Sequence, residues 1–153
     1  MTIMEKVLAL HEVELFAHMS TEELSVLASI AEEDQFDAGN RIIAENEPAD
    51  SLNLVLTGKV QVKRGEQEIF VAGPNDTLGA LSMLDGEPWL FSAEVVEHTS
   101  VLRIDRETFL DVASDHPGIT ENILRSLTAR IRRLVDRPLA GSGSPGETNE
   151  AGD

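Results

Sequence analysis

The side chains of this sequence that are capable of metal, nucleophilic or acid–base chemistry do not fall into the spacings that such sites require. The histidines lack the H-x-x-x-H and H-E-x-x-H patterns that place two imidazoles on one helix face: His11, His18, His98 and His116. Ser82 and Ser92 lie outside a G-x-S-x-G elbow, and cysteine is absent. We therefore expect neither a metal site nor an enzyme.

Carboxylates that could supply an acid–base pair occur in three clusters: Glu22–Glu23, Glu32–Asp34, and Glu45 with Glu47 and Asp50. Neighbouring side chains on a helix point to different faces, and most runs of charge are solvated surface. We expect the first cluster to mark the start of a helix. The second is predicted to lie in a connection after that helix.

The charge balance excludes several classes of partner. The 153 residues carry 12 Lys and Arg against 28 Asp and Glu, a net charge of -16. A chain this acidic repels nucleic acid and anionic lipid. The hydrophobic share of 41% is enough for one core. No stretch of 18 apolar residues without a charge is present, so we expect a soluble cytoplasmic protein with no nucleic-acid partner and no direct membrane insertion.

Helical periodicity occurs at both ends of the chain. A short helix is predicted at about Ile3 to His11, and Ser20 followed by Glu23 has the form of a capping box for a second one. A long amphipathic helix is predicted over 118–137, after Pro117. Five of the 12 basic residues crowd into it. They either match the helix dipole and an acidic body, or form a stripe facing a partner or lipid.

Between Gln35 and Asp105 the apolar period changes from 3.6 to 2, with turn signals at short spacing. Four turns are predicted, at 37–40, 57–59, 64–66 and 73–76. This pattern favours an α+β fold: an antiparallel β jelly roll or barrel flanked by N-terminal helices and a long C-terminal helix. We assign residues 1–137 to this domain. Residues 138–153, rich in Gly, Ser and Pro and acidic, are predicted to be a disordered tail.

One ordered set of residues resembles the cyclic-nucleotide-binding domain family. The pattern F-x-x-G-x-x-I-x-x-E-x-x-x-A-D-x-L-x-x-V-x-x-G-x-V-x-V runs from Phe36 to Val62, and Pro74–Gly79 is similar to the family's P-G-D-x-F-G turn. Leu84–Pro88 resembles its cassette loop, and Val101–Ile104 with Phe109 its last strand and following helix. The likeness covers about residues 13–134.

The resemblance implies a pocket in which a short helix after a glycine faces a cyclic phosphate. In members that bind cyclic nucleotide, a Glu just after that glycine accepts from the ribose hydroxyl, and an Arg neutralises the phosphate. Here the glycine is Gly79 and the Glu position is Ala80. The Arg position is Trp89 without a gap, or Phe91 if Ser92–Ala93 is the small pair. Both anchors are therefore missing.

A vestigial pocket is what remains, with these candidate residues: Leu78, Gly79, Ala80, Leu81, Ser82, Trp89, Phe91, Ser92 and Ala93. Three outcomes stay open for it. It could hold a weak anion or another ligand, Trp89 and Phe91 could fill the space as core, or the exposed triplet 89–91 could dock a partner.

Because both anchors are missing, we interpret the chain as a non-catalytic regulatory module of this fold that has lost ordinary cyclic AMP and cyclic GMP recognition, and we expect no cofactor. The resemblance implies that segment 78–84 and the 118–137 helix move together, and that this helix joins a homodimer or a protein partner. The family's transcription factors carry a helix-turn-helix domain after this helix, which we do not expect here. The alternative is a sensor that binds a cyclic nucleotide weakly or another ligand, as part of a larger membrane-associated or helical-repeat protein.

Overall fold

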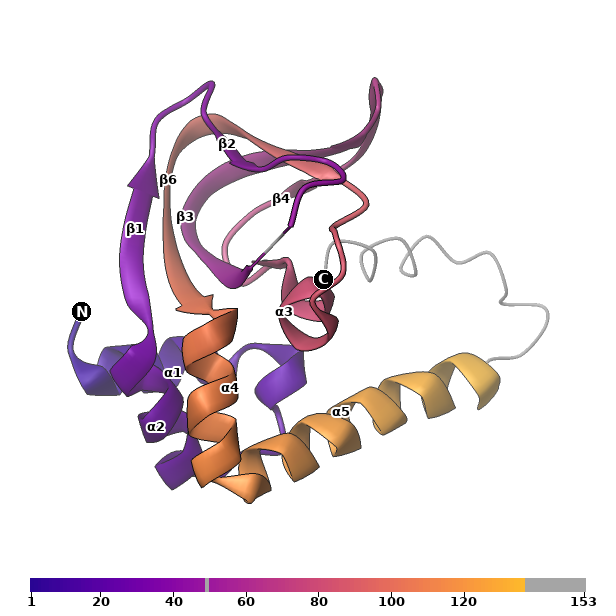
Figure 1. Cartoon of the computed structure of the whole chain (residues 1–153). Helices are drawn as coiled ribbons and strands as arrows, with labels where there is room; N and C mark the ends of the chain where they lie inside the picture. Colours follow the sequence, from indigo (N-terminus) through magenta and orange to yellow (C-terminus); the bar gives the residue numbers. More distant parts are fainter. Residues whose placement is uncertain (49, 137–153) are drawn as a thin grey trace.

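The computed structural model describes residues 1–48 and 50–136. Two layers are visible in Figure 1, a β-roll and a group of helices packed at one end of it. Helices α1 (Ile3–His11), η1 (Glu14–Phe16), α2 (Thr21–Ile30), α4 (Arg106–Asp115) and α5 (Pro117–Asp136) make up the helical layer, while α3 (Ala80–Asp85) lies between the roll and α5. The α+β class predicted from the sequence is confirmed.

The N-terminal helices form where their capping residues predict. The Ser20 hydroxyl accepts from the Glu23 N–H at 3.1 Å, and the Glu23 carboxylate accepts from the Ser20 N–H at 2.9 Å. This reciprocal box satisfies two of the unpaired donors that begin every helix. Helix α1 begins with the same device at Thr2 and Glu5.

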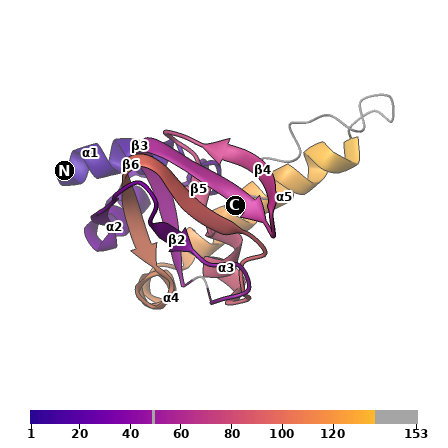
Figure 2. The ribbon, with the colours of Figure 1, turned by 90° about the horizontal axis from the view of Figure 1, so that it is seen from above.

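The sheet is antiparallel and is built around two long strands, β3 (Ser51–Arg64) and β6 (Ser92–Asp105). Its order is β1-β6-β3-β4, with β2 also pairing β6 and β5 pairing β3. The remaining strands are β1 (Glu32–Phe36), β2 (Arg41–Ile43), β4 (Gln67–Ala72) and β5 (Thr77–Leu78). Seen from above, the strands cross over the helical layer, and α5 projects past them (Figure 2).

The turn predicted at 57–59 is wrong, because Gly58 lies inside β3. The β3–β6 register shifts on both sides of it, between Val55 and Thr57 and again between Thr57 and Val60. A bulge that places one residue at positive φ favours glycine, as several types of turn do. Gly58 has a φ of 108°. The predicted turns at 37–40, 64–66 and 73–76 do connect strands.

Two hydrophobic clusters lie on opposite faces of the long strands. Leu52 and Leu54 pack with the helices, whereas Val55 and Val60 face the interior of the roll. Because alternate side chains of a strand point to opposite faces, a strand buried on both faces reads as a continuous apolar run. Residues 51–55 are all buried, rather than the alternate ones only.

The prediction that Glu32–Asp34 lie in a connection is also wrong. These residues form the first part of β1, with Glu32 opposite Arg103 and Asp34 opposite Val101 on β6. Within the described residues β1 pairs with β6 alone, and its side chains are exposed or half-buried. An edge strand of this kind carries no apolar alternation, and charged side chains are typical of it.

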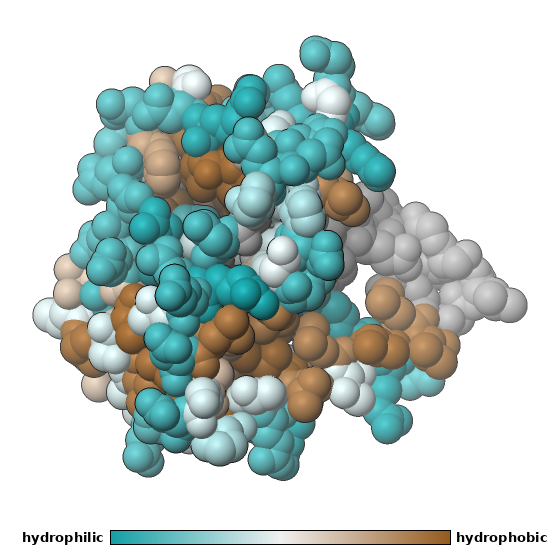
Figure 3. Space-filling model, viewed as in Figure 1, coloured by the Kyte–Doolittle hydropathy of each residue, from teal (hydrophilic) through white to brown (hydrophobic). Residues whose placement is uncertain are grey.

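Helix α5 is amphipathic as predicted, but most of its apolar face is open. Ile119 and Ile123 are buried, whereas four further apolar residues are 47 to 76% exposed: Leu124, Ile131, Leu134 and Val135. The C-terminal half of the helix projects from the body with hydrophobic atoms along it (Figure 3). Residue 137 and the predicted tail at 138–153 lie outside the described residues.

A pair of arginines ties α5 to η1. The Glu14 carboxylate binds Arg130 at 3.4 Å and also accepts a hydrogen bond from Arg133. Partial burial raises the pKa of Glu14, but the two guanidinium groups outweigh this and hold the pKa below its ordinary value. The basic residues at the C-terminal end of α5 thus pair with an acidic residue of the body, as one of the two predicted alternatives requires.

Glu14→Gln is expected to lower the free energy of unfolding at neutral pH by up to about 1 kcal/mol, because these pairs are partly exposed. The folded-state pKa lies below the unfolded value of about 4.3. The stabilisation is therefore complete above that value and is lost as the pH falls through the folded-state pKa. Urea unfolding from pH 3 to 7 measures the difference. Glu12→Gln is the control, because it removes the same charge from a residue without an ion pair to the described part of the chain. An equal loss of stability in both variants would contradict a stabilising role for the Glu14 ion pairs.

Candidate functional site

The vestigial pocket begins at Gly79, which turns the chain from β5 into α3. Its φ is 83°, and an added Cβ would stand 2.6 Å from the Ser51 carbonyl oxygen. The Gly79 carbonyl accepts the first bond of the helix, from the Met83 N–H at 2.9 Å. Only glycine can adopt this left-handed backbone while the Ser51 carbonyl lies so close to its Cα.

The residues of α3 divide between two environments. Ala80 and Met83 are buried in the hydrophobic cluster that contains Leu52 and Leu54 and packs with the helices. Ser82 is buried on the other side, where it lines a cavity, and Leu81 is 42% exposed at the rim of the same cavity. The expected Glu position therefore carries a methyl group that packs against the helices.

Both candidates for the Arg position are buried in the roll. Trp89 is 4% exposed and Phe91 7%. Their rings meet edge to face, with centroids 5.6 Å apart and planes at 72°, an arrangement that aromatic pairs prefer. Leu90 between them is 54% exposed. The triplet is thus not an exposed unit, and the core reading of Trp89 and Phe91 fits their burial.

The remaining predicted residues belong to strands. Leu78 is fully buried in β5, opposite Asn53 of β3. Ser92 and Ala93 open β6, opposite Lys63 and Val62. The structure therefore brings together Leu81, Ser82, Trp89 and Phe91 at one cavity, while the other predicted residues lie behind it.

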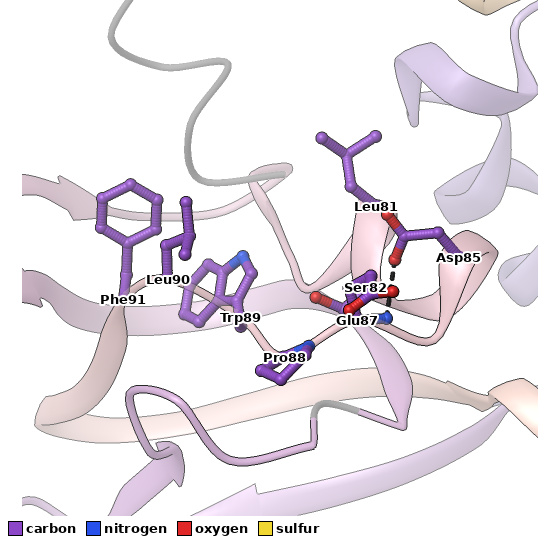
Figure 4. Close-up of a pocket in the computed structure, with 8 residues that line it drawn as sticks. All are labelled: Leu81, Ser82, Asp85, Glu87, Pro88, Trp89, Leu90 and Phe91. Carbon is purple, nitrogen blue, oxygen red and sulfur yellow. Dashed lines mark hydrogen bonds between the residues drawn. The ribbon is translucent and has the colours of Figure 1, made fainter.

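This cavity, which we call the Trp89 cavity, has a volume of about 350 Å³ and is shown in Figure 4. Its lining is mostly apolar and includes four residues that the sequence did not assign to a pocket wall: Asp85, Glu87, Pro88 and Leu90. The Glu87 N–H donates to Asp85 Oδ1 at 2.9 Å. Among the described residues, the lining contains two carboxylates and no basic side chain. The described residues contain no group of three or more His, Asp or Glu side chains that could hold a metal ion.

Arg106 is the basic residue that sequence reasoning missed. Its guanidinium carbon would stand 3.2 Å from a methyl group placed on Gly86, which ends α3 with a φ of 73°. Its backbone N–H donates to the Asp50 carbonyl at 2.7 Å, and its Nε is buried without a partner among the described residues. The side chain thus connects the start of α4 to the end of α3. Nothing in the local sequence signals a contact across twenty residues.

Comparison with known proteins agrees with this architecture. Residues 33–116 match the family described as cyclic nucleotide-binding domain. A CRP-like cAMP-activated global transcriptional regulator of Mycobacterium tuberculosis is 33% identical over 119 residues, which are 72% of this chain and 53% of the regulator. Glutaminase 2 of Bradyrhizobium diazoefficiens is 32% identical over 130 residues, 82% of this chain and 20% of the glutaminase.

Among solved structures, the N-terminal domain of a transcriptional regulator from Streptomyces coelicolor A3(2) superposes with a TM-score of 0.78 at 24% identity. The match covers 84% of this chain and 95% of that one, and at this identity it shows the fold. The chain spans about half the length of the mycobacterial regulator, at 53%. None of the helices in the described residues is both long and apolar enough to cross a membrane.

Proposed function

This chain belongs to the cyclic nucleotide-binding domain family, and from that premise we propose that it is a non-catalytic regulatory module that has lost ordinary recognition of cyclic AMP and cyclic GMP. The observation that carries the proposal is the burial of Trp89 and Phe91 in the roll, where an arginine would have to reach the phosphate. No lysine or arginine lies between Gly65 and Thr99.

The two missing anchors set the expected fall in affinity for a cyclic nucleotide. A hydrogen bond to a charged group contributes about 1.5 to 3 kcal/mol. Losing both the ribose acceptor at Ala80 and the phosphate partner at Trp89 or Phe91 is therefore expected to weaken affinity by roughly a hundredfold or more. Asp85 and Glu87 at the Trp89 cavity add repulsion toward a phosphate.

Calorimetric titration with cyclic AMP and cyclic GMP at low salt tests the proposal. We expect no heat and no change in Trp89 fluorescence up to millimolar nucleotide. The cAMP-activated regulator of Mycobacterium tuberculosis is the positive control. Micromolar binding by this chain would show that backbone donors suffice, and would make it a cyclic-nucleotide sensor.

A sensor of another ligand is the second candidate function, and the Trp89 cavity is the observation that favours it. Its volume of about 350 Å³ lies within the range of small-molecule sites, and its walls are mostly apolar. A ligand there would contact α3 and the loop 86–91 directly. A thermal shift on ligand addition distinguishes this function from a pure interaction module.

Coupling of the cavity to the long helix runs through Arg106. Its guanidinium packs on Gly86 at the end of α3, and α4, which it begins, leads directly into α5. Occupation of the cavity that shifted α3 would therefore press on the base of α4. This is a physical route by which segment 78–84 and the 118–137 helix would move together.

Helix α5 is the proposed surface for a second copy of the chain or for a protein partner. Four apolar residues on it are exposed, and such contiguous patches mark contact sites. Ile131 lies near the centre of this stripe, one or two turns from Leu124 and Val135.

Ile131→Glu is expected to convert a dimer to monomer, because a carboxylate buried in an apolar helix seam carries a large desolvation penalty. Sedimentation velocity of both proteins at several concentrations measures the change. Arg132→Gln alters the net charge by the same amount at an adjacent position off the stripe, and should leave assembly intact. If the wild-type protein stayed monomeric at all concentrations, self-association would be contradicted, and the exposed face of α5 would be assigned to a different protein partner.

A further inference from the structure

We propose that the Trp89 cavity binds a small organic cation with an apolar body and one hydrogen-bond acceptor. This inference rests on the proposed loss of cyclic-nucleotide recognition and names the ligand chemistry that the altered site would take instead. It follows from three properties of the lining: a hydrogen-bond donor open to the cavity, the sign of its charge, and its shape.

The donor is the indole N–H of Trp89. The residue is 4% exposed, and no acceptor in the described part of the chain takes a hydrogen bond from this N–H, which is not among the fully buried unpartnered atoms and is therefore open to the cavity that Trp89 lines. Its backbone carbonyl is occupied by the Asn46 N–H at 3.0 Å. Figure 4 shows the indole nitrogen on the edge of the ring that is turned toward α3, where Leu81 and Asp85 stand. A ligand oxygen in the cavity would accept a hydrogen bond from this N–H in place of solvent.

The charge of the lining selects against anions. Asp85 and Glu87 both line the cavity, and no Lys, Arg or His of the described part of the chain does. The hydrogen bond from the Glu87 N–H to Asp85 Oδ1 holds the two residues in one tight turn at the end of α3. A phosphate or carboxylate at this place meets repulsion from both side chains, whereas an ammonium group is attracted by both.

The shape of the cavity favours a compact apolar body. Leu81 and Leu90 stand on opposite sides of it, and Pro88, Trp89 and Phe91 complete the apolar part of the wall. A volume of about 350 Å³ accommodates a single ring with a short polar arm. The ring of the ligand would lie between Leu81 and Leu90. Its acceptor oxygen would face the indole N–H, and its ammonium group would face the two carboxylates.

Three probes that share one phenyl ring and one benzylic hydroxyl test the proposal. They are 2-amino-1-phenylethanol, which is cationic, 1-phenyl-1,2-ethanediol, which is neutral, and mandelate, which is anionic. Titration at low salt, followed by the fluorescence of Trp89, the chain's only tryptophan, and by calorimetry, measures each affinity. We expect the cation to bind about threefold more tightly than the diol, and the diol more tightly than mandelate.

Two variants separate the contributions. Asp85→Asn with Glu87→Gln keeps an oxygen to accept the Glu87 backbone N–H, and should bring the three affinities together. Trp89→Phe keeps an aromatic ring but removes the donor, and should weaken diol binding about fivefold by calorimetry. If Trp89→Phe fails to fold, the carboxylate variant still decides the question.

Equal affinities in the unaltered protein, tightest binding of mandelate, or no binding of any probe at millimolar concentration would overturn the cation site. Cyclic AMP titrated in the same series tests the proposed function separately. Micromolar cyclic AMP binding would overturn that function. Failure of the three probes without cyclic AMP binding would overturn only the ligand class inferred here.

Discussion

Gly58→Ala is expected to lower the free energy of unfolding by roughly 3 kcal/mol or more. A Cβ on this residue would stand 2.6 Å from both the His98 carbonyl oxygen and the Thr99 Cα, and closer still to the Thr99 hydroxyl. Two of these atoms are backbone of β6, and the pairs of Lys59 with Glu97 and Thr57 with Ser100 on either side restrict their movement. The φ of 108° adds strain of its own for any residue with a side chain. Chemical denaturation followed by circular dichroism measures the loss.

Gly65→Ala provides the matched control for Gly58. Gly65 also has a positive φ, of 63°, but nothing lies within 4 Å of an added Cβ. It should therefore lose only the strain of the left-handed backbone, about 1 kcal/mol. If Gly58→Ala were no more damaging than Gly65→Ala, the close approach of β3 and β6 at the bulge would be contradicted.

Trp89→Ala is expected to lower the free energy of unfolding by about 3 to 5 kcal/mol, as removal of a large aromatic from a core does. The indole belongs to the hydrophobic cluster inside the roll, which includes Ile43, Val60 and Val95. It packs edge to face on Phe91. Thermal and urea unfolding both report this loss. The protein should remain a monomer or dimer as before, since the change lies inside the roll.

Leu90→Ala, at the next position, should alter stability by less than about 1 kcal/mol because the side chain is 54% exposed. The pair of variants decides between the two roles considered for segment 89–91. A large loss at Trp89 and a small one at Leu90 mean that the aromatic side chains hold the roll together. A reversed order, with Trp89 dispensable and Leu90 needed for assembly, would return the segment to a docking role.

Local signals predicted the helices well because capping and amphipathic spacing act over a few residues. The Ser20 and Glu23 box forms as the sequence indicates, and α1 spans Ile3–His11 as expected. The α+β jelly-roll class followed from the change of period and from the ordered set of residues shared with the family. Element type is thus encoded within short windows.

Features set by tertiary pairing were beyond the reach of local signals. Strand β1 lies at the edge of the sheet, where backbone hydrogen bonds to β6 hold it in place. Its side chains are largely exposed, so it accommodates Glu32, Glu33 and Asp34 without an apolar face. Gly58 resembles a turn residue, and only its place opposite β6 makes it a bulge.

Four of the residues predicted for the pocket line the Trp89 cavity: Leu81, Ser82, Trp89 and Phe91. The sequence interpretation put Trp89 or Phe91 at the position of an arginine, but whether their side chains lie inside or outside the roll depends on packing across it. The contact of Arg106 with Gly86 joins residues that are distant in the sequence, and no periodicity predicts it.

The long pairing of β3 with β6 also sets the order in which the molecule can assemble. Its register joins Ser51 to Asp105 and Lys63 to Ser92, so the central contacts of the sheet close loops of roughly 30 to 55 residues. During synthesis the N-terminal helices can form early, whereas the sheet waits for β6 to leave the ribosome. Helix α3 and the Trp89 cavity lie within the segment that this closure brackets. The cavity therefore acquires its shape only after β6 has paired with β3, and a nascent chain cannot bind a ligand there before Asp105 has left the ribosome.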